Sequence, residues 1–312
     1  MLQSCQIRLM GTTIDVQIED DFAAEKLKLV VDLLYLYNHR FSANDENSEL
    51  SAINKNAGKS DIVVHPQLFE LIKIGKLHSL SNPSNLNIAL GPLVKSWKIG
   101  FDGANLPTNE VVKSALALSN PEAIILDESN LTVFLSKAGM EIDLGALAKG
   151  FIADLIMAEL KAQKVKSALI NLGGNVLVHG ENPNRLNGNW KIGIQNPQQN
   201  RHEHIGNLTI HNKSVVTSGI YERFLTKNGK TYHHIFDRNT GFPIDSEMVS
   251  LTIIADKSLD CEIWTTRLFG LPISLALEQI NQNPKLDGII IDKENHIFLS
   301  DFTKCSFVPL IG

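Results

Sequence analysis

The sequence contains only three cysteines among 312 residues, and these lie far apart at Cys5, Cys261 and Cys305. An odd number at such spacing argues against a disulfide framework and against a cysteine zinc site. Basic residues are not in excess, since the formal net charge is −5, so we expect no nucleic-acid partner. No apolar run approaches the roughly 18 residues of a membrane-spanning helix, so we expect no transmembrane segment.

Internal repeats, low-complexity segments and clear linkers are also absent from the sequence. The hydrophobic fraction of 43% and the charged fraction of 20% are those of a globular protein. The length suffices for two average domains or one large one. Helical and strand patterns interleave along the chain, which favours a single two-lobed α+β unit over residues 1–312.

The first twelve residues show no basic segment followed by an apolar core, so no signal peptide is predicted in the sequence as written. Residues Leu2 to Cys5 nevertheless resemble the end of a bacterial lipoprotein signal. The expected location is therefore cytoplasmic for the sequence as written. It becomes periplasmic or membrane-anchored if a leader has been removed.

Apolar periodicity and turn residues predict most of the helices and strands. Helices are expected over 21–40, 63–79, 108–118, 258–270 and 273–282, and Asn228-Gly229 predicts a hairpin. Strands are expected over 5–19 with a break at 10–12, and over 86–94, 123–127, 131–135, 190–195, 208–216, 249–255, 288–292 and 296–300. A central helix is expected from Leu144 to about Lys164, followed by a strand that ends at Gly173.

The start of the central helix is the first candidate site. Asp143, Ala146 and Lys149 recur every third residue, so they share one face if the helix begins there. Free backbone N–H groups at a helix start, together with a nearby lysine, favour binding of a phosphate. The same residue pattern is equally compatible with an N-capping aspartate and a surface lysine.

Three further segments carry residues that could bind a ligand or a metal, or take part in catalysis. Gly173 and Gly174 follow a strand and allow close backbone approach to a ligand, or form a plain tight turn. His234 and Asp237 are spaced to point into one cleft, with the histidine as a base or phosphate ligand. Glu262 and Thr266 lie one helical turn apart, and their oxygens suit a hard cation such as Mg²⁺.

Taken together and in order, these segments resemble the ApbE family, flavin transferases that move FMN from FAD onto a protein. The resemblance runs from Met10 to Gly270. It covers Met10–Thr12, Phe41–Leu50, Asn87–Trp97, Asp143–Gly150, Asn171–Gly174, Ser218–Tyr221, His234–Pro243 and Thr266–Phe269.

The resemblance implies an α+β fold of two lobes, with mixed, largely antiparallel sheets flanked by helices. It implies Mg²⁺-dependent transfer of FMN to a threonine or serine hydroxyl of an acceptor flavoprotein subunit of a redox complex, with release of AMP. The implied catalytic residues are His234 and Asp237, and the implied metal ligands are Ala146 through its carbonyl, Glu262, Thr265 and Thr266. The implied FAD contacts are Met10, Asn44, Trp97, Lys98, Ile99, Asp143, Lys149, Gly173, Gly174, Ser218, Gly219 and Phe236.

Three positions depart from the family pattern. Asn44 stands where the family usually has a tyrosine, Glu262 stands where it has a metal-binding aspartate, and Asp237-Arg238 replaces Asp-Pro. Two alternative functions stay open, and Asn44 and Glu262 give weight to the second of them. One is an FAD pyrophosphatase, in which water replaces the protein hydroxyl, and the other is a flavin-binding protein with impaired catalysis.

Overall fold

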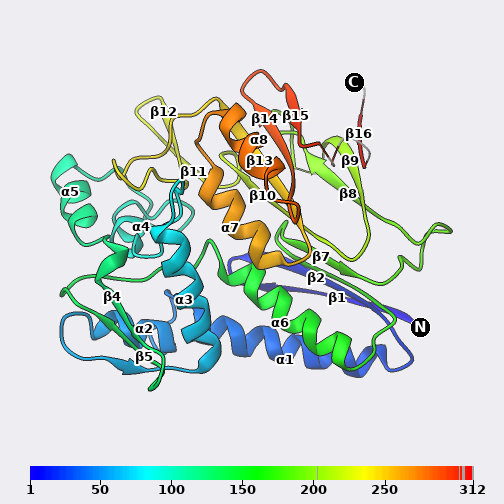
Figure 1. Cartoon of the computed structure of the whole chain (residues 1–312), viewed down its shortest axis with the longest axis horizontal. Coiled ribbons are helices and arrows are strands. Elements are labelled where there is room, and N and C mark those ends of the chain that lie inside the picture. Colours follow the sequence, from blue (N-terminus) through cyan, green and yellow to red (C-terminus); the bar gives the residue numbers. More distant parts are fainter. Residues whose placement is uncertain (202, 302, 304–305, 311–312) are drawn as a thin grey trace.

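The largest element of the fold is an eight-stranded sheet with the order β1-β2-β6-β7-β10-β13-β14-β15 (Figure 1). The structure is a computed structural model that describes residues 1–201, 203–301, 303 and 306–310, so Cys305 lies outside the described residues. All neighbouring strands of this sheet are antiparallel. The strands are β1 (Leu2–Leu9), β2 (Thr12–Glu19), β6 (Ser167–Leu172), β7 (Val176–His179), β10 (Ser214–Gly219), β13 (Met248–Ala255), β14 (Asp287–Asp292) and β15 (Ile297–Leu299).

Four helices cover one face of this sheet. They are α1 (Ala23–Phe41), α6 (Ala148–Ala162), α7 (Ser258–Leu268) and α8 (Ile273–Asn281). Helices α1 and α6 lie side by side against the N-terminal strands, and α7 packs between α6 and strands β10 and β13 (Figure 1). This packing brings the start of α6 against α7, which places the two helical candidate segments together.

A three-stranded sheet covers part of the opposite face. Its strands are β8 (Trp190–Gln195), β9 (His204–Ile210) and β16 (Phe307–Pro309). Strand β13 is buried along its full length because successive side chains alternate between the two layers. Ile253 packs toward the helices, whereas Ile254 packs toward the small sheet.

The remaining elements form the part of the molecule on the left in Figure 1. They are α2 (Glu49–Lys55), α3 (Pro66–Leu80), α4 (Gly91–Trp97), α5 (Asn109–Ala117), the short 3₁₀ helix η1 (Pro121–Ala123), and the sheet of β3 (Ile62–Val63), β4 (Ile124–Asp127) and β5 (Thr132–Leu135). The hairpin of β11 (Phe224–Lys227) and β12 (Lys230–His233) lies next to them. It turns at Asn228-Gly229, as predicted.

The α+β class and the predominance of antiparallel strands confirm the fold expected from the sequence. Most predicted elements are present, including the break at Met10 and Gly11, where both φ angles are positive. Among the described residues no helix combines the length and the apolar character needed to cross a bilayer. Cys5 and Cys261 are both free thiols.

Three predicted elements were wrong in type or extent. Residues 86–90 form no strand, and Pro92 lies in the first turn of α4, where its missing N–H costs nothing. The segment 208–216 divides between β9 and β10 at a turn where Asn212 has φ +50°. The central helix begins at Ala148 rather than Leu144.

Candidate functional site

The turn before α6 holds the acid that was expected to start the helix. Asp143 accepts a hydrogen bond from the backbone N–H of Gly145 at 2.7 Å, so its side chain closes a local turn instead of capping the helix. Burial raises the pKa of the Asp143 carboxyl, while the Gly145 N–H and the charge of Arg223 act in the opposite direction. Asp143 lies before α6 and Lys149 lies within it, so the two residues share no helix face. The prediction of a common face was wrong because it placed the start of the helix too early.

Lys149 and Glu262 form the contact between α6 and α7. The Lys149 ammonium donates to Glu262 Oε1 at 2.9 Å, and the backbone N–H of Gly150 donates to Glu262 Oε2 at 2.7 Å. An added Cβ at Gly150 would lie 2.6 Å from the Ser258 carbonyl oxygen, so only glycine allows this close approach. Glu262 is 3% exposed, whereas the side chain of Lys149 is 29% exposed.

Asp154 fixes the start of α7 from the neighbouring helix. Its two carboxylate oxygens accept from the backbone N–H groups of Ser258 and Leu259 at 2.8 and 2.9 Å. These are free N–H groups of a helix start, which has no side-chain cap of its own. Burial raises the pKa of Asp154 to about 6. Asp154 thereby sets the position of Glu262 one turn further along α7.

His234 lies where the hairpin strand β12 ends. Its Nδ1 is 3.1 Å from the carbonyl oxygen of Arg223, and because a carbonyl only accepts, Nδ1 carries the proton. Burial above all, together with the charges of Arg223, His233 and Lys149, lowers the pKa of His234 to about 4, against an opposing effect of the Arg223 carbonyl. The imidazole is therefore neutral at pH 7, with the Nε2 lone pair available to take a proton.

Arg223 is a site residue that sequence reasoning missed. Its side chain runs past Gly100, where an added Cβ would lie 2.7 Å from Arg223 Cδ, and its guanidinium lies 5.9 Å from the ring centre of Phe101. The charge of Arg223 lowers the pKa of both Asp143 and His234. The sequence offered one signal for it. Arg223 comes directly before a hairpin, and the candidate base His234 comes directly after that hairpin.

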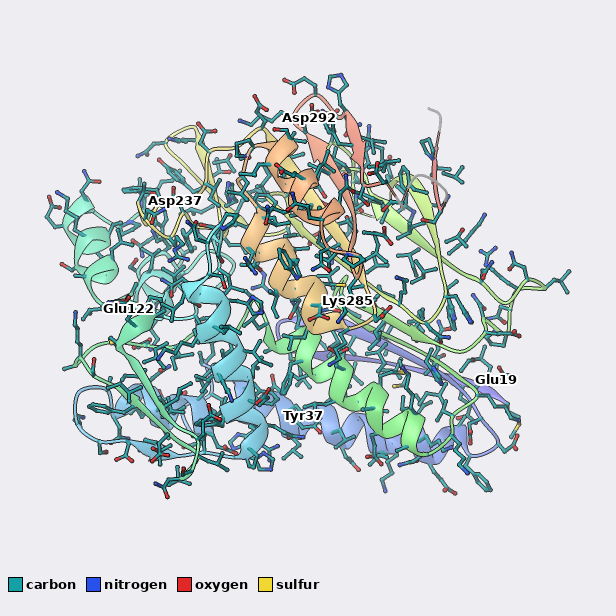
Figure 2. The ribbon with its side chains drawn as sticks, in the orientation of Figure 1. Glu19, Tyr37, Glu122, Asp237, Lys285 and Asp292 are labelled. Carbon is teal, nitrogen blue, oxygen red and sulfur yellow. The ribbon has the colours of Figure 1, made fainter. Side chains whose placement is uncertain are left out.

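The carboxylate of Asp237 accepts hydrogen bonds from the backbone of its own turn. Oδ1 accepts from the backbone N–H groups of Asn239 at 2.7 Å and Thr240 at 3.3 Å. The turn lies in the loop beyond β12, away from the large sheet (Figure 2). Asp237 therefore shapes the loop that carries His234.

Arg238 explains one departure from the family pattern. Its Nη1 donates to the carbonyl oxygens of Ser79, Ser84 and Leu86 at 2.7, 3.1 and 3.3 Å. Proline has no side-chain donor, so a protein with proline at this position cannot make these three hydrogen bonds. They tie the loop after α3 to the loop that carries Asp237.

An aromatic cluster packs against the loop that carries Asp237. Trp97 is fully buried and donates from Nε1 to the Gly241 carbonyl at 3.1 Å. The ring centroids of Tyr232, Phe236 and Phe242 lie within 5.7 Å of the Trp97 ring centroid. Ile99 is also buried, and Lys98 between them is exposed. Trp97, Ile99 and Phe236 thus form the packed wall under the site rather than an open stacking surface.

The other predicted FAD contacts lie in turns or at strand ends. Met10 lies in the β1–β2 turn, and Gly173 and Gly174 form the two-residue β6–β7 turn with φ of +68° and +98°. Ser218 and Gly219 end β10, where the Tyr221 ring packs over Gly219. Asn44 is exposed, in a loop closed by the Ser48 hydroxyl donating to the Ser42 carbonyl at 2.6 Å.

The residues predicted as metal ligands offer a set of hard oxygen donors. Glu262 and the half-buried Thr266 lie one turn apart on α7. Within the described residues, no hydrogen bond reaches the exposed carbonyl of Ala146, because the Gly150 N–H is turned to Glu262. The Thr265 hydroxyl donates back to the Glu262 carbonyl at 3.1 Å. These oxygens are donors of the kind that Mg²⁺ prefers, and the Lys149 ammonium occupies Oε1 of Glu262 in this structure.

A second group of possible metal-binding side chains lies elsewhere, at the β14–β15 turn. Asp292, Glu294 and His296 come within 4.8 Å of one another there. The carboxylate of Asp292 already accepts from the backbone of Glu294 and from the backbone and ring of His296. These bonds account for the group as the closure of a hairpin turn.

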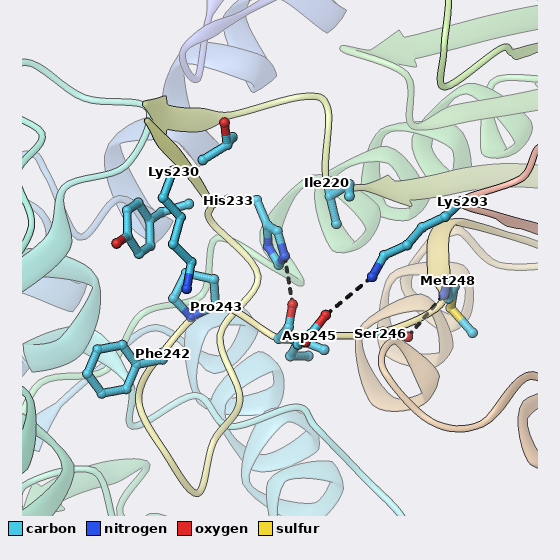
Figure 3. A pocket seen from close by; sticks show the side chains of 12 residues that line it. Ile220, Lys230, His233, Phe242, Pro243, Asp245, Ser246, Met248 and Lys293 are labelled. Carbon is cyan, nitrogen blue, oxygen red and sulfur yellow. Dashed lines mark hydrogen bonds and ion pairs between the residues drawn. The ribbon is translucent and has the colours of Figure 1, made fainter. Parts of the chain in front are cut away.

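A cavity of about 280 Å³ lies between the end of β12 and residues 242–248, and His234 is not among the residues that line it (Figure 3). His233 lines it and donates from Nε2 to the Ile244 carbonyl at 2.9 Å. The Lys293 ammonium pairs with Asp245 at 3.3 Å across the same cavity. The two adjacent histidines therefore have different surroundings, because His234 bonds to Arg223.

Comparison with known proteins gives one consistent answer. Residues 10–290 match the model of the ApbE family. A protein of Klebsiella pneumoniae (strain 342) named FAD:protein FMN transferase is 41% identical over 304 residues, which cover 97% of this chain and 93% of that protein. Another of the same name from Treponema pallidum (strain Nichols) is 34% identical over 284 residues, covering 87% of this chain and 78% of that protein.

Solved structures of similar proteins share the fold. The ApbE protein of Thermotoga maritima superimposes with a TM-score of 0.89 at 23% identity, over 98% of this chain and 99% of that one. The flavin transferase ApbE of Vibrio cholerae superimposes with a TM-score of 0.84 at 23% identity, over 98% of this chain and 100% of that one.

Proposed function

The chain belongs to the ApbE family, and on this basis we propose that it transfers FMN from FAD onto an acceptor protein. The observation that carries the proposal is the 41% identity, over nearly the whole chain, to a protein named FAD:protein FMN transferase. The acceptor we propose is a flavoprotein subunit of a redox complex. The side chain that receives FMN is a threonine or serine.

In the proposed reaction, the acceptor hydroxyl attacks the FMN-side phosphorus of FAD. A bond forms between the hydroxyl oxygen and that phosphorus, the bond to the AMP-side oxygen breaks, and AMP leaves with the electron pair. The hydroxyl proton passes to Nε2 of His234, which is neutral because its pKa is about 4. The Arg223 carbonyl holds the imidazole in the tautomer this role requires.

Phosphoryl transfer depends on neutralising charge more than on covalent help. Arg223 is bonded to His234 through its backbone carbonyl, and Lys149 reaches Glu262 from the start of α6, so we assign these two cationic side chains to the diphosphate. The Ala146 carbonyl, Glu262 and Thr266 would hold Mg²⁺, and Thr265 would support them through its bond to the Glu262 carbonyl. When bound, Mg²⁺ would neutralise diphosphate oxygens.

An FAD pyrophosphatase is the second candidate, and Asn44 favours it. In the family this loop usually offers an aromatic ring, whereas the exposed Asn44 has no ring to stack on a base or to exclude water. Water in place of the acceptor hydroxyl would give FMN and AMP from the same site.

The two functions separate in one experiment. The protein is incubated with FAD and Mg²⁺, with and without a candidate acceptor, and released AMP and protein-bound flavin are measured. Transferase activity predicts AMP release that needs the acceptor and equals the flavin bound to it. Equal AMP release without the acceptor would assign the protein as a pyrophosphatase.

A further inference from the structure

The two oxygens of the Glu262 carboxylate have partners of different kinds. Oε2 accepts from the backbone N–H of Gly150, which is fixed in the first turn of α6. Oε1 accepts from the ammonium of Lys149, which is the end of a long side chain. One oxygen is thus anchored to the helix backbone, and the other has a partner that can leave.

The two side chains also differ in freedom. Glu262 is 3% exposed, and the absence of a Cβ at Gly150 lets its Oε2 lie against the α6 backbone. Lys149 is 29% exposed and its charge reaches His234, whose pKa it lowers. The ammonium is therefore the end of the ion pair that a ligand arriving from solvent can reach.

A divalent cation at this site needs the same carboxylate oxygen. The other donors are the Ala146 carbonyl, two residues before α6, and the Thr266 hydroxyl one turn along α7 from Glu262. A dication and an ammonium both at Glu262 Oε1 would repel each other strongly, since this carboxylate is only 3% exposed. One of the two cations must leave when the other binds.

We propose that Lys149 occupies the cation position at Glu262 while FAD is absent and moves to the diphosphate when FAD binds. This inference rests on the proposed function, since it assigns Lys149 to the FAD diphosphate. FAD then frees Glu262 Oε1 for Mg²⁺, so FAD and Mg²⁺ bind with positive coupling, and linkage makes the coupling reciprocal. In the absence of nucleotide, Lys149 thus keeps Glu262 Oε1 closed to metal.

The test measures Mg²⁺ binding to the nucleotide-free protein by isothermal titration calorimetry. Lys149→Met removes the competing charge, and we expect it to bind Mg²⁺ about tenfold more tightly than the unmodified protein. Lys149→Arg keeps the charge and should bind Mg²⁺ no more tightly than the unmodified protein. Lys73→Met is the matched control, because it breaks an exposed pair with Glu128 of 2.8 Å outside the site.

Thermal unfolding of each variant checks that it is folded. If Lys149→Met is unstable, Lys149→Gln gives the same comparison, because its amide keeps a donor for Glu262 without the charge. Mg²⁺ affinity that is unchanged or weaker in the folded neutral variants would overturn the proposal. FMN transfer by the unmodified protein is measured separately, so a failed transfer beside a tenfold gain in Mg²⁺ affinity would count against the function alone.

Discussion

Arg223 acts on His234 in two ways at once. Its backbone carbonyl lies 3.1 Å from His234 Nδ1 and fixes the proton there, while its positive charge disfavours a second proton on the ring. Burial is the larger cause of the lowered pKa, and the Arg223 charge adds to it. Together they leave Nε2 unprotonated and able to act as a base at neutral pH.

The pH dependence of FMN transfer should reflect this lowered pKa. A histidine with the ordinary pKa near 6.5 would be mostly protonated at pH 5.5 and would lose about tenfold in rate. His234, with a pKa of about 4, stays neutral there, so kcat/KM should hold its value between pH 7 and 5.5. His234→Gln should abolish transfer while leaving FAD affinity within about threefold. An acid limb centred near pH 6.5 in the profile of the unmodified protein would contradict the assignment.

Replacing Arg223 should shift the titration of His234. Arg223→Gln keeps the backbone carbonyl and removes the charge, so the pKa of His234 should rise toward its ordinary value. The histidine ring signals in NMR spectra measure this directly, and His234→Gln assigns them. Arg201→Gln is a control, because Arg201 pairs with Glu222 at the surface and is not among the groups that shift His234. An unchanged His234 titration would place Arg223 outside the site.

The metal assignment depends on the charge of Glu262. Glu262→Gln keeps the shape and one acceptor oxygen but removes the charge, so Mg²⁺-dependent AMP release should fall at least about a hundredfold. Because the amide also leaves Lys149 without its buried partner, the free energy of unfolding should be measured in parallel. Turnover equal to that of the unmodified protein would remove Glu262 from the metal site.

Arg238 should contribute to stability rather than to chemistry. Arg238→Pro restores the family residue but leaves the carbonyl oxygens of Ser79, Ser84 and Leu86 without their shared donor. Loss of these half-buried hydrogen bonds should lower the free energy of unfolding by about 1–3 kcal/mol. Chemical denaturation measures the change, and equal stability of the two proteins would show that water replaces the guanidinium at no cost.

Local patterns in the sequence predicted most elements of the fold, and ordered motifs predicted the family. The start of α6 was misplaced because Leu144 and Leu147 continue its apolar spacing, while the Asp143 turn that delays the helix depends on one hydrogen bond to Gly145. The strand expected over 86–94 failed because a glycine followed by proline can begin a helix as readily as it ends a strand.

The site itself was only partly predictable. Lys149 and Glu262 were each identified, but their contact joins residues 113 positions apart and depends on how α6 packs against α7. Arg223 was missed because its importance comes from its neighbours in space, Gly100 and His234, and its place just before a hairpin is a weak local signal. Sequence patterns indicate residue types, whereas packing decides which of them meet.

The central claim is that FMN from FAD becomes covalently bound to a protein acceptor. Its most direct test is mass spectrometry of a candidate acceptor subunit after incubation with this protein, FAD and Mg²⁺, followed by peptide mapping. The account predicts a mass increase of one FMN unit on a single threonine or serine, and none with His234→Gln. An unmodified acceptor, in a reaction where FAD is nevertheless converted to FMN and AMP, would contradict it.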